Sequence, residues 1–356
     1  VVFPDQLLHT HRIAHQKAAG RFLGHTAVRP SGVTNDRHPY RWVVFGGVAG
    51  VYFGFGVVAA SIAPVVGEIR SDLGLSRSAM GLALGAWQLV YIVTAPIGGR
   101  LVDRWGLRWS LTAGAGIVIA SGLARATASD LTTLWLAVAL FGVGGPIISI
   151  GAPKIVSLWF QGNERNIAAG IYATGPLTGM AVALATAGGF VIPLIGSWRG
   201  ISIVYGSVIF IVAVLWWIFS KEAPLTNLTG YKQRDDNTST FKVISELLRI
   251  RNVKVVLVMA FATFLLNHGL GNWLPTLLID GGMTITEAGS WAALGTAIGI
   301  SGLLIIPPIA RQGYRALTMA ILLVIAAVAG VGLVFTNGPI LILSIIISNM
   351  VRGPMM

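Results

Sequence analysis

The side chains able to do chemistry in this sequence are few, and they lie inside long apolar segments. The predicted membrane spans contain one histidine, His268, which adjoins Asn267 and precedes Asn272 by one helical turn. Cysteine is absent, and the sequence has neither a His-Glu-x-x-His pair nor a Gly-x-x-x-x-Gly-Lys-Ser/Thr loop. These absences exclude thiol catalysis, a zinc-peptidase site and a P-loop ATPase. A serine hydrolase would depend on His268 as its base, so we predict no enzyme, no cofactor and no metal site.

Polar and aromatic side chains near the centres of the apolar segments indicate a path for a solute instead. An ionisable or strongly polar side chain inside lipid usually faces a partner or a water-filled cavity. Gln88 and Tyr91 are one turn apart and share a helix face, and Thr296 is near-equivalent to Gln88 when the two halves of the sequence are aligned. Each residue has a structural alternative, because a threonine can bind its own helix backbone and a tyrosine can simply pack. We predict a substrate pathway formed by Tyr52, Gln88, Tyr91, Tyr172, Asn267, His268, Asn272, Thr296 and Arg352.

Arg352 lies near the middle of the last apolar segment, where inserting an arginine costs about 2.5–3.5 kcal/mol. No Asp or Glu lies in the interior of a predicted span to neutralise it. An unpaired cation there favours an anionic substrate, whose charge completes the pair. The alternative is that Arg352 pairs with helices beyond the end of this sequence. The same lack of carboxylates disfavours proton symport through Asp or Glu and leaves His268, anion exchange or facilitated transport.

The composition indicates a chain whose main solvent is lipid. Of its 356 residues, 54% are hydrophobic and 11% are charged, and the mean hydropathy is +0.77. A soluble domain carries about 25% charged residues. The 45 glycines agree, because small residues let membrane helices approach closely. The net charge of +12 does not indicate nucleic acid, because the basic residues lie in tails and short loops between apolar spans.

Long apolar runs predict an all-α, multi-pass membrane protein. A helix needs about 20 apolar residues to cross a bilayer, and these runs lack the alternation of barrel strands. With the N-terminus in the cytoplasm, twenty Lys and Arg residues lie on the inner side and four, Arg70, Arg77, Arg125 and Arg199, on the outer side. The positive-inside rule supports that orientation. The predicted spans are 43–66, 79–98, 110–128, 132–152, 167–193, 201–219, 255–279, 288–309, 316–335 and 339–356.

Two weak internal matches indicate a duplication. The pattern Arg104-x-Gly106-x-Arg108 recurs as Arg311-x-Gly313-x-Arg315 at an offset of 207 residues. Gly144-Gly145-Pro146 matches Arg352-Gly353-Pro354 at an offset of 208. Because the offsets agree, spans 7–10 are predicted to repeat spans 1–4, and the counterparts of spans 5 and 6 would follow the end of this sequence. We therefore predict two pseudo-symmetric six-helix bundles, the second truncated after about four helices.

The predicted organisation has four regions. Residues 1–40 are expected to be a disordered cytoplasmic tail of native or non-native origin, and residues 41–220 an N-terminal six-helix bundle. Residues 221–254 form the long polar connector and are expected to be a cytoplasmic linker. Residues 255–356 are expected to form a partial C-terminal bundle, helices 7–10.

The most specific motif is Gly99-x-Leu101-Val102-Asp103-Arg104-x-Gly106-Leu107-Arg108-x-x-Leu111. It resembles the signature between helices 2 and 3 of the major facilitator superfamily of secondary transporters, and the resemblance extends over about residues 41–356. It implies that Asp103 latches helix 2 to the second bundle in the outward-facing state, through an eleventh helix beyond this sequence. We assign a conformational latch to Gly99, Asp103, Arg104, Gly106 and Arg108. The alternative is that these residues only set topology, because arginines hold the segment at the cytoplasmic surface.

Softer matches concern the subfamily. Pro153-Lys154, Trp159-Phe160, Glu164-Arg165 and Asn272-Trp273-Leu274-Pro275 resemble transporters of the cyanate/nitroimidazole type or related anion transporters. Together with Arg352, they favour a small anion as the substrate.

These features predict a secondary active transporter that moves a small solute, favoured to be a small anion, by alternating access. Its expected partners are the substrate, the lipid bilayer and a coupling ion, without nucleic acid. We expect a monomer in the plasma (inner) membrane of a bacterium or archaeon. Two alternatives stay open, namely a transporter-like sensor that binds ligand without moving it and an exporter of drugs or amphiphiles.

Overall fold

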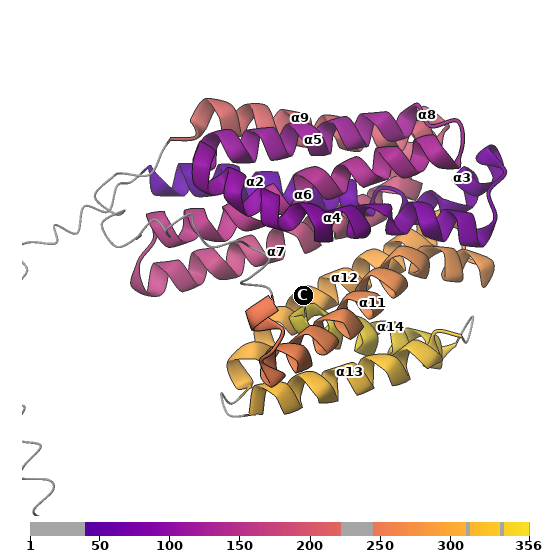
Figure 1. Ribbon diagram of the computed structural model, residues 1–356. Helices are drawn as coiled ribbons and strands as arrows, with labels where there is room; N and C mark the ends of the chain where they lie inside the picture. The colour runs from indigo at the N-terminus through magenta and orange to yellow at the C-terminus, as the bar shows by residue number, and fades with distance from the viewer. Residues whose placement is uncertain (1–39, 222–244, 311–313, 335–337, 356) are drawn as a thin grey trace, which may run out of the picture. The chain divides into compact units, whose positions relative to one another are not determined.

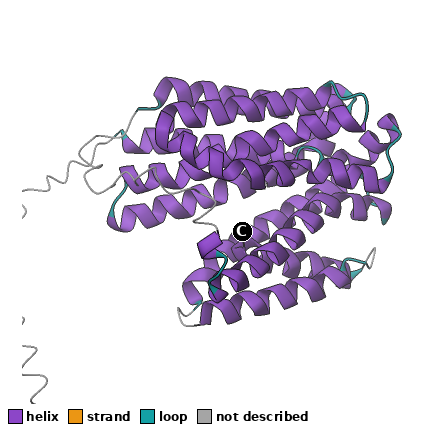
Figure 2. Ribbon diagram, viewed as in Figure 1, coloured by secondary structure: helices purple, strands orange, loops and turns teal. Residues whose placement is uncertain are grey.

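The computed structural model describes residues 40–221, 245–310, 314–334 and 338–355, and in these ranges the elements are helices (Figure 2). Eight helical segments of the described ranges are long and apolar enough to cross a membrane. The predicted tail and most of the predicted linker lie outside the described residues. The second copy of the arginine pattern also falls largely outside them, because residues 311–313 are not described.

The first bundle contains six membrane-length segments, which Figure 1 shows lying alongside one another. The first is α2 (Arg41–Ala60) continued by η1 (Ala63–Val65) and α3 (Val66–Leu73). Pro64 lies in the first turn of η1, and the segment changes from α-helix to 3-10 helix there. The other five are α4 (Arg77–Trp105), α5 (Leu107–Ala126), α6 (Leu131–Trp159), α7 (Gly162–Thr186) with η2 (Ala187–Val191) and α8 (Ile192–Ile195), and α9 (Trp198–Phe219).

The second group of helices contains α11 (Arg251–Asp280), α12 (Ile285–Ile309), α13 (Arg315–Gly332), α14 (Pro339–Arg352) and η5 (Gly353–Met355). Of these, α11 and α12 have membrane-spanning length, whereas α13 and α14 are shorter apolar helices. In both groups the second and fourth helical segments pack together, α4 against α6 and α12 against α14. This repeated packing parallels the sequence offsets.

Glycine residues allow these helices to approach each other closely. A Cβ atom built on Gly142 of α6 would collide with the backbone carbonyl of Trp87 in α4, and one on Gly302 of α12 would collide with that of Met350 in α14. Membrane helices gain attraction from such close contacts, because lipid tails give no hydrophobic drive for helices to associate.

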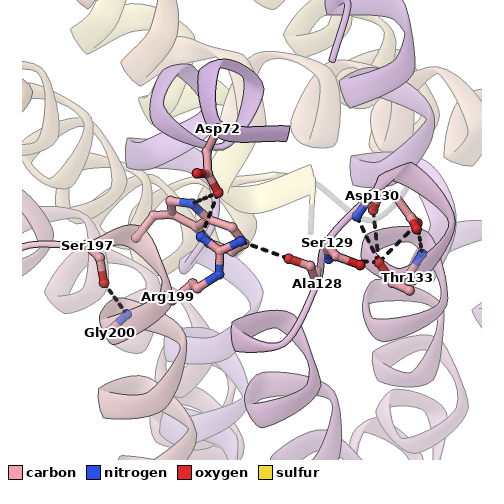
Figure 3. Close-up of polar contacts among 9 residues, drawn as sticks. Asp72, Ala128, Ser129, Asp130, Thr133, Ser197, Arg199 and Gly200 are labelled. Atoms are coloured by element: carbon pink, nitrogen blue, oxygen red, sulfur yellow. Dashed lines mark hydrogen bonds and ion pairs between the residues drawn. The ribbon is translucent and has the colours of Figure 1, made fainter. Parts of the chain in front are cut away.

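The loops at the α3 end of the first bundle are tied together by polar contacts (Figure 3). Arg199, at the start of α9, donates to the Asp72 carboxylate at 2.6 Å and to the Ala128 carbonyl at 3.0 Å. Asp130 and Thr133 form a capping box at the start of α6. The Thr133 backbone N–H stabilises the carboxylate and so holds the pKa of Asp130 below its ordinary value. These contacts fix one end of the bundle.

Candidate functional site

A cavity of about 1,020 Å³ lies between the two helix groups. It extends from Asn252, at the start of α11, to Asn272 in the later part of the same helix. Its volume suits a small organic molecule. The remaining lining residues come from α2, α4, α6, α7, α11, α12, α13 and η5 and are predominantly aromatic, aliphatic and methionine side chains. The lining residues are Tyr52, Phe55, Ala59, Trp87, Tyr91, Ser149, Tyr172, Ala173, Pro176, Leu177, Met180, Asn252, Val255, Val256, Met259, Ala260, Thr263, Phe264, Asn267, His268, Asn272, Leu303, Ala316, Met319 and Met355.

Three tyrosines form part of the cavity wall on the side of the first bundle. The Tyr52 hydroxyl donates to the Ser149 carbonyl at 3.2 Å, and the Tyr91 hydroxyl shares a short hydrogen bond with the Ser149 hydroxyl. Tyr172 meets Tyr52 edge to face, with ring centroids 5.9 Å apart. All three of these predicted pathway residues therefore line the cavity, and Ser149 holds two of their hydroxyls.

An aromatic contact joins the two bundles at the cavity. Trp87 of α4 lies edge to face with His268 of α11, at 4.9 Å between ring centroids, and Phe264 lies 4.2 Å from the same histidine ring. The imidazole is thus packed among rings as well as lining the cavity. Asn267 and Asn272, the other predicted residues of α11, also line it.

Arg352 is buried directly behind the α11 wall and is not itself a lining residue. It is 4% exposed, and it donates to the backbone carbonyls of Leu266 and Asn267 at 3.4 Å and to the Asn349 side chain at 2.7 Å. Among the described residues, no carboxylate forms an ion pair with it. Its hydrogen bonds are satisfied by neutral acceptors, so its charge is left uncompensated in a low-dielectric region.

Gln88 and Thr296 lie outside the cavity lining. Gln88 is buried, and its Oε1 has no hydrogen-bond partner among the described residues. The adjacent Trp87 takes the cavity position on α4. Thr296 donates to the carbonyl of Ala292 in its own helix at 2.9 Å, which is the backbone-bonded alternative for a membrane threonine.

The cavity reaches Asn252 at the start of α11, and at the end of the bundle interface far from Asn252 the two bundles pack directly against each other. Ile62, Ala63 and Leu184 of the first bundle share one buried core with Leu278 and Ala288 of the second. A Cβ atom on Gly289 of α12 would lie 2.5 Å from the Leu184 carbonyl oxygen, so the two backbones are in contact. The cavity therefore ends at this packed region and reaches the α11 N-terminus at its other end.

A profile of the Major Facilitator Superfamily matches residues 44–356, which is most of the chain. The chain belongs to the Major Facilitator Superfamily. This confirms the family predicted from the Gly99–Arg108 signature, whereas the subfamily stays a prediction. The superfamily consists of membrane transporters rather than enzymes, and the chain is accordingly an integral membrane protein.

Relatives with named functions are similar at low identity. The hexuronate transporter of Bacillus subtilis (strain 168) is 29% identical over 215 residues, which is 60% of this chain and 50% of the relative. The probable galactarate/D-glucarate transporter GudP of the same organism is 24% identical over 276 residues, 66% of this chain and 57% of the relative. Multidrug resistance protein MdtH of Yersinia enterocolitica serotype O:8 / biotype 1B (strain NCTC 13174 / 8081) is 31% identical over 153 residues, 41% of this chain and 35% of the relative. The chain thus spans between about a third and somewhat more than half of the length of these curated relatives.

Solved superfamily structures share the fold. A bacterial homolog of the human lysosomal transporter Spinster, in an inward-facing and unoccupied conformation, matches with a TM-score of 0.69 and 17% identity over 89% of this chain and 74% of that one. The xylose transporter XylE from E. coli, in a partially occluded inward open conformation, gives 0.67 and 15% over 88% and 84%. These likenesses confirm the predicted all-α, multi-pass fold class of a superfamily member.

The superfamily signature ends a helix rather than forming a long loop. The spans predicted from sequence placed Gly99–Arg108 between two helices, but α4 continues through Gly99, Asp103 and Arg104 to Trp105. Only Gly106, at φ +77°, separates α4 from α5. Nothing in Arg100–Trp105 prevents helical φ and ψ angles, whereas a positive φ favours glycine.

The charged residues of the signature make contacts within the first bundle. Asp103 forms an ion pair with Lys154 of α6 at 2.6 Å. Arg108 donates to the Trp217 carbonyl at 2.9 Å and stacks over that indole at 4.4 Å. Arg104 is exposed in the last turn of α4. In this conformation the signature therefore ties α4 to α6 through Asp103 and α5 to α9 through Arg108, all within one bundle.

Several site residues escape reasoning from sequence. Trp87, Phe264 and Ser149 line the cavity, but an aromatic or serine side chain inside an apolar span carries no distinctive signal. Thr263 also lines the cavity and was missed, although it precedes Asn267 by one turn and helical spacing is a signal that could have found it. Arg125, predicted from sequence to lie on the outer side, is in the last turn of α5 and is 1% exposed, so it is buried in the first bundle and not part of an exposed loop.

Proposed function

We propose that the full-length protein is a secondary transporter of small organic anions that works by alternating access between its two bundles. The observation that carries this proposal is the position of Arg352. Its buried guanidinium donates to the backbone carbonyl of Asn267, which lines the cavity. Only helix α11 therefore separates a solute in the cavity from the uncompensated positive charge of Arg352.

The energetics favour an anion over a neutral solute. Two unit charges interact with an energy of about 332/(εr) kcal/mol. Because the dielectric constant ε is lower in protein than in bulk water, the interaction between Arg352 and an anion in the cavity is several times stronger than it would be in water. Among the described residues, the cavity lining has no Asp or Glu to cancel this field. An organic anion also suits the lining, because its carbon skeleton can pack against the rings of Tyr52, Trp87 and Phe264.

Relatives point in the same direction. Two of the similar curated proteins carry the names of sugar-acid transporters, for hexuronate and for galactarate or D-glucarate. These substrates are organic carboxylates, and so they fit the electrostatic argument.

The absence of carboxylates from the described cavity lining also bears on energy coupling. A proton carrier of the Asp or Glu type has no candidate there. His268 lines the cavity but is enclosed by Trp87 and Phe264. We therefore propose that transport is driven by exchange of one anion for another or by the gradient of a coupling ion.

We place the protein in the plasma membrane of a bacterial or archaeal cell, and the excess of Lys and Arg on one side supports the proposal that this side faces the cytoplasm. The cavity reaches the start of α11 on that side, so we assign the conformation as open to the cytoplasm. The protein is proposed to act as a monomer, because the cavity is formed within one chain.

The test is transport and binding by the full-length protein in proteoliposomes. Hexuronate or galactarate inside the vesicles should drive uptake of the labelled anion, while a neutral sugar of similar size should not. Arg352→Gln should weaken anion binding by about tenfold, because it removes the charge behind the cavity. Arg352→Lys should retain much of the preference, which separates loss of charge from loss of packing.

A neutral sugar transported as well as the anion would contradict the proposal, as would an equal effect of Arg352→Gln on both solutes. Binding without any movement of solute would indicate the sensor alternative. The exporter alternative is favoured by the methionines and aromatic rings of the lining and by the similarity to a multidrug resistance protein. Binding of cationic amphiphiles in preference to carboxylates would support it.

A further inference from the structure

One face of α11 carries buried polar atoms without a hydrogen-bond partner in the described part of the chain. Thr263 Oγ1 and both heteroatoms of the Asn267 amide form no hydrogen bond with the described residues. The two side chains lie one helical turn apart, and both line the cavity. They are 7% and 5% exposed. We call Thr263 and Asn267 the α11 polar pair.

Thr263 differs from three other threonines of the membrane helices. The hydroxyls of Thr174, Thr178 and Thr296 each bind a carbonyl of their own helix. Those threonines are satisfied without a ligand, whereas Thr263 is not. Leaving a buried polar atom without a hydrogen-bond partner is unfavourable, and folded proteins keep few such atoms. Two adjacent residues of this kind on a cavity wall therefore mark a place prepared for a ligand.

The inventory of donors and acceptors identifies the ligand group. The Asn267 amide offers two donor hydrogens and an acceptor oxygen, and the Thr263 hydroxyl both donates and accepts. A bare carboxylate accepts only, so it would leave Asn267 Oδ1 unsatisfied. A ligand hydroxyl donates as well as accepts and can satisfy both side chains. Their atoms are covered in this conformation, so contact requires the side chains to rotate toward the cavity that they line.

We propose that the α11 polar pair is a hydroxyl-reading subsite and that the substrate is a hydroxylated carboxylate rather than a simple carboxylate. This inference rests on the proposed function, since Arg352 behind the same wall supplies the preference for an anion. Arg352 donates to the Asn267 backbone carbonyl and so fixes that residue's backbone beside the charge. Charge and hydroxyl recognition would then be combined on one stretch of α11.

The experiment compares galactarate with adipate, two dicarboxylates of equal chain length that differ in their hydroxyl groups. Their dissociation constants are measured on the purified full-length protein by calorimetry. The wild-type protein should prefer galactarate. Thr263→Val and Asn267→Leu should each weaken galactarate binding by about tenfold, the effect of losing one or two buried hydrogen bonds. Adipate binding should stay unchanged or tighten, because adipate has no hydroxyl group for the subsite to bind.

Thr112→Val is the matched control. The Thr112 hydroxyl binds the Arg108 carbonyl within α5, a helix that contributes no residue to the cavity lining, so this variant should leave the galactarate-to-adipate ratio unchanged. Thr263→Ser, which keeps the hydroxyl, should keep the preference and so separate recognition from packing.

The outcomes distinguish the two proposals. Equal wild-type affinity for galactarate and adipate, or an equal loss for both in Thr263→Val and Asn267→Leu, would overturn the hydroxyl-reading subsite and leave the anion transporter standing. No binding of either dicarboxylate, together with binding of a neutral or cationic solute, would overturn both.

Discussion

At the scale of single residues, two buried arginines have different surroundings. Arg352 lies behind the cavity wall, whereas Arg125 of α5 lies inside the first bundle and donates to the Val58 carbonyl at 2.8 Å and to the Ser61 hydroxyl at 2.9 Å. Val58 is in the last turn of α2, whose final carbonyls have no partner within the helix. Arg125 therefore acts as a cation that caps the carboxyl end of α2, where the helix dipole favours positive charge.

Replacing Arg125 by Leu should lower stability with little effect on substrate affinity. The substitution removes the hydrogen bonds that the Arg125 guanidinium donates to the Val58 carbonyl and the Ser61 hydroxyl at the bend between α2 and η1, and a hydrogen bond to a charged group is worth about 1.5–3 kcal/mol. Thermal unfolding of the detergent-solubilised full-length protein should begin at a lower temperature, and Arg125→Lys should recover part of the loss. A weaker substrate affinity at unchanged thermal stability would instead assign Arg125 to the substrate path.

The same scale shows what sequence can and cannot predict about the site. Tyr52, Tyr91, Tyr172, Asn267, His268 and Asn272 were predicted from polarity near span centres, and the structure places them on the cavity. Gln88 and Trp87 are neighbours, and only the rotation of α4 decides that Trp87 faces the cavity. In a helix with apolar residues on every side, the period of 3.6 residues does not fix that rotation. The unpartnered state of Thr263 and Asn267 is likewise a property of packing that sequence does not carry.

At the scale of elements, the apolar runs predict the helices well and their ends poorly. Hydropathy falls at Gly99, but the helix continues to Trp105, because charged residues at a membrane surface stay helical until Gly106 allows a positive φ. The bend at Pro64 within the first segment was also not predicted. Helix ends depend on local backbone angles and capping, whereas span existence depends on the sum over about 20 residues.

The prediction at this scale concerns Asp103 of α4 and the balance between the inward-facing and outward-facing states. Asp103 pairs with Lys154 in the same bundle here, while the superfamily signature implies a partner in the second bundle when the cavity opens outward. Asp103→Asn should therefore leave membrane insertion intact, destabilise the outward-facing state and slow transport. The ion pair itself is largely exposed on the Asp103 side, so its loss should cost little folding stability.

The effect is measured by chemical labelling of a cysteine introduced at position 252. Asn252 lines the end of the cavity that lies near the N-terminus of α11. This sequence contains no cysteine, so the introduced group has no competitor within it. Asp103→Asn should raise the fraction labelled from the cytoplasmic side. Unchanged labelling together with unchanged flux would leave the signature with only a topological role.

At the scale of the whole molecule, alternating access requires the packed end of the interface to open. Two kinds of contact hold this end closed, which we call the seal: an ion pair between the bundles and close backbone packing, and they differ in strength. Arg77 and Asp280 form a cross-bundle ion pair at 3.0 Å, but both side chains are substantially exposed, and such pairs contribute about 0–1 kcal/mol. The backbone contacts of α7 and η2 with α12 exclude even a methyl group. Besides the contact at Gly289, a Cβ atom on Gly188 would lie 2.8 Å from the Thr286 nitrogen. Close packing should therefore dominate the seal.

Adding a methyl group at this contact should open the seal more than removing the ion pair does. Gly289→Ala forces α12 away from the Leu184 carbonyl, whereas Arg77→Ala removes an interaction that water already screens. A cysteine introduced at Leu278, which is buried in the shared core, should react from the outer side in Gly289→Ala and stay protected in Arg77→Ala. Gly116→Ala is the control, because a Cβ atom there meets nothing within 4 Å and the same methyl group is added without a collision. If Arg77→Ala exposed Leu278→Cys as strongly as Gly289→Ala, electrostatics rather than close packing would hold the outer end shut.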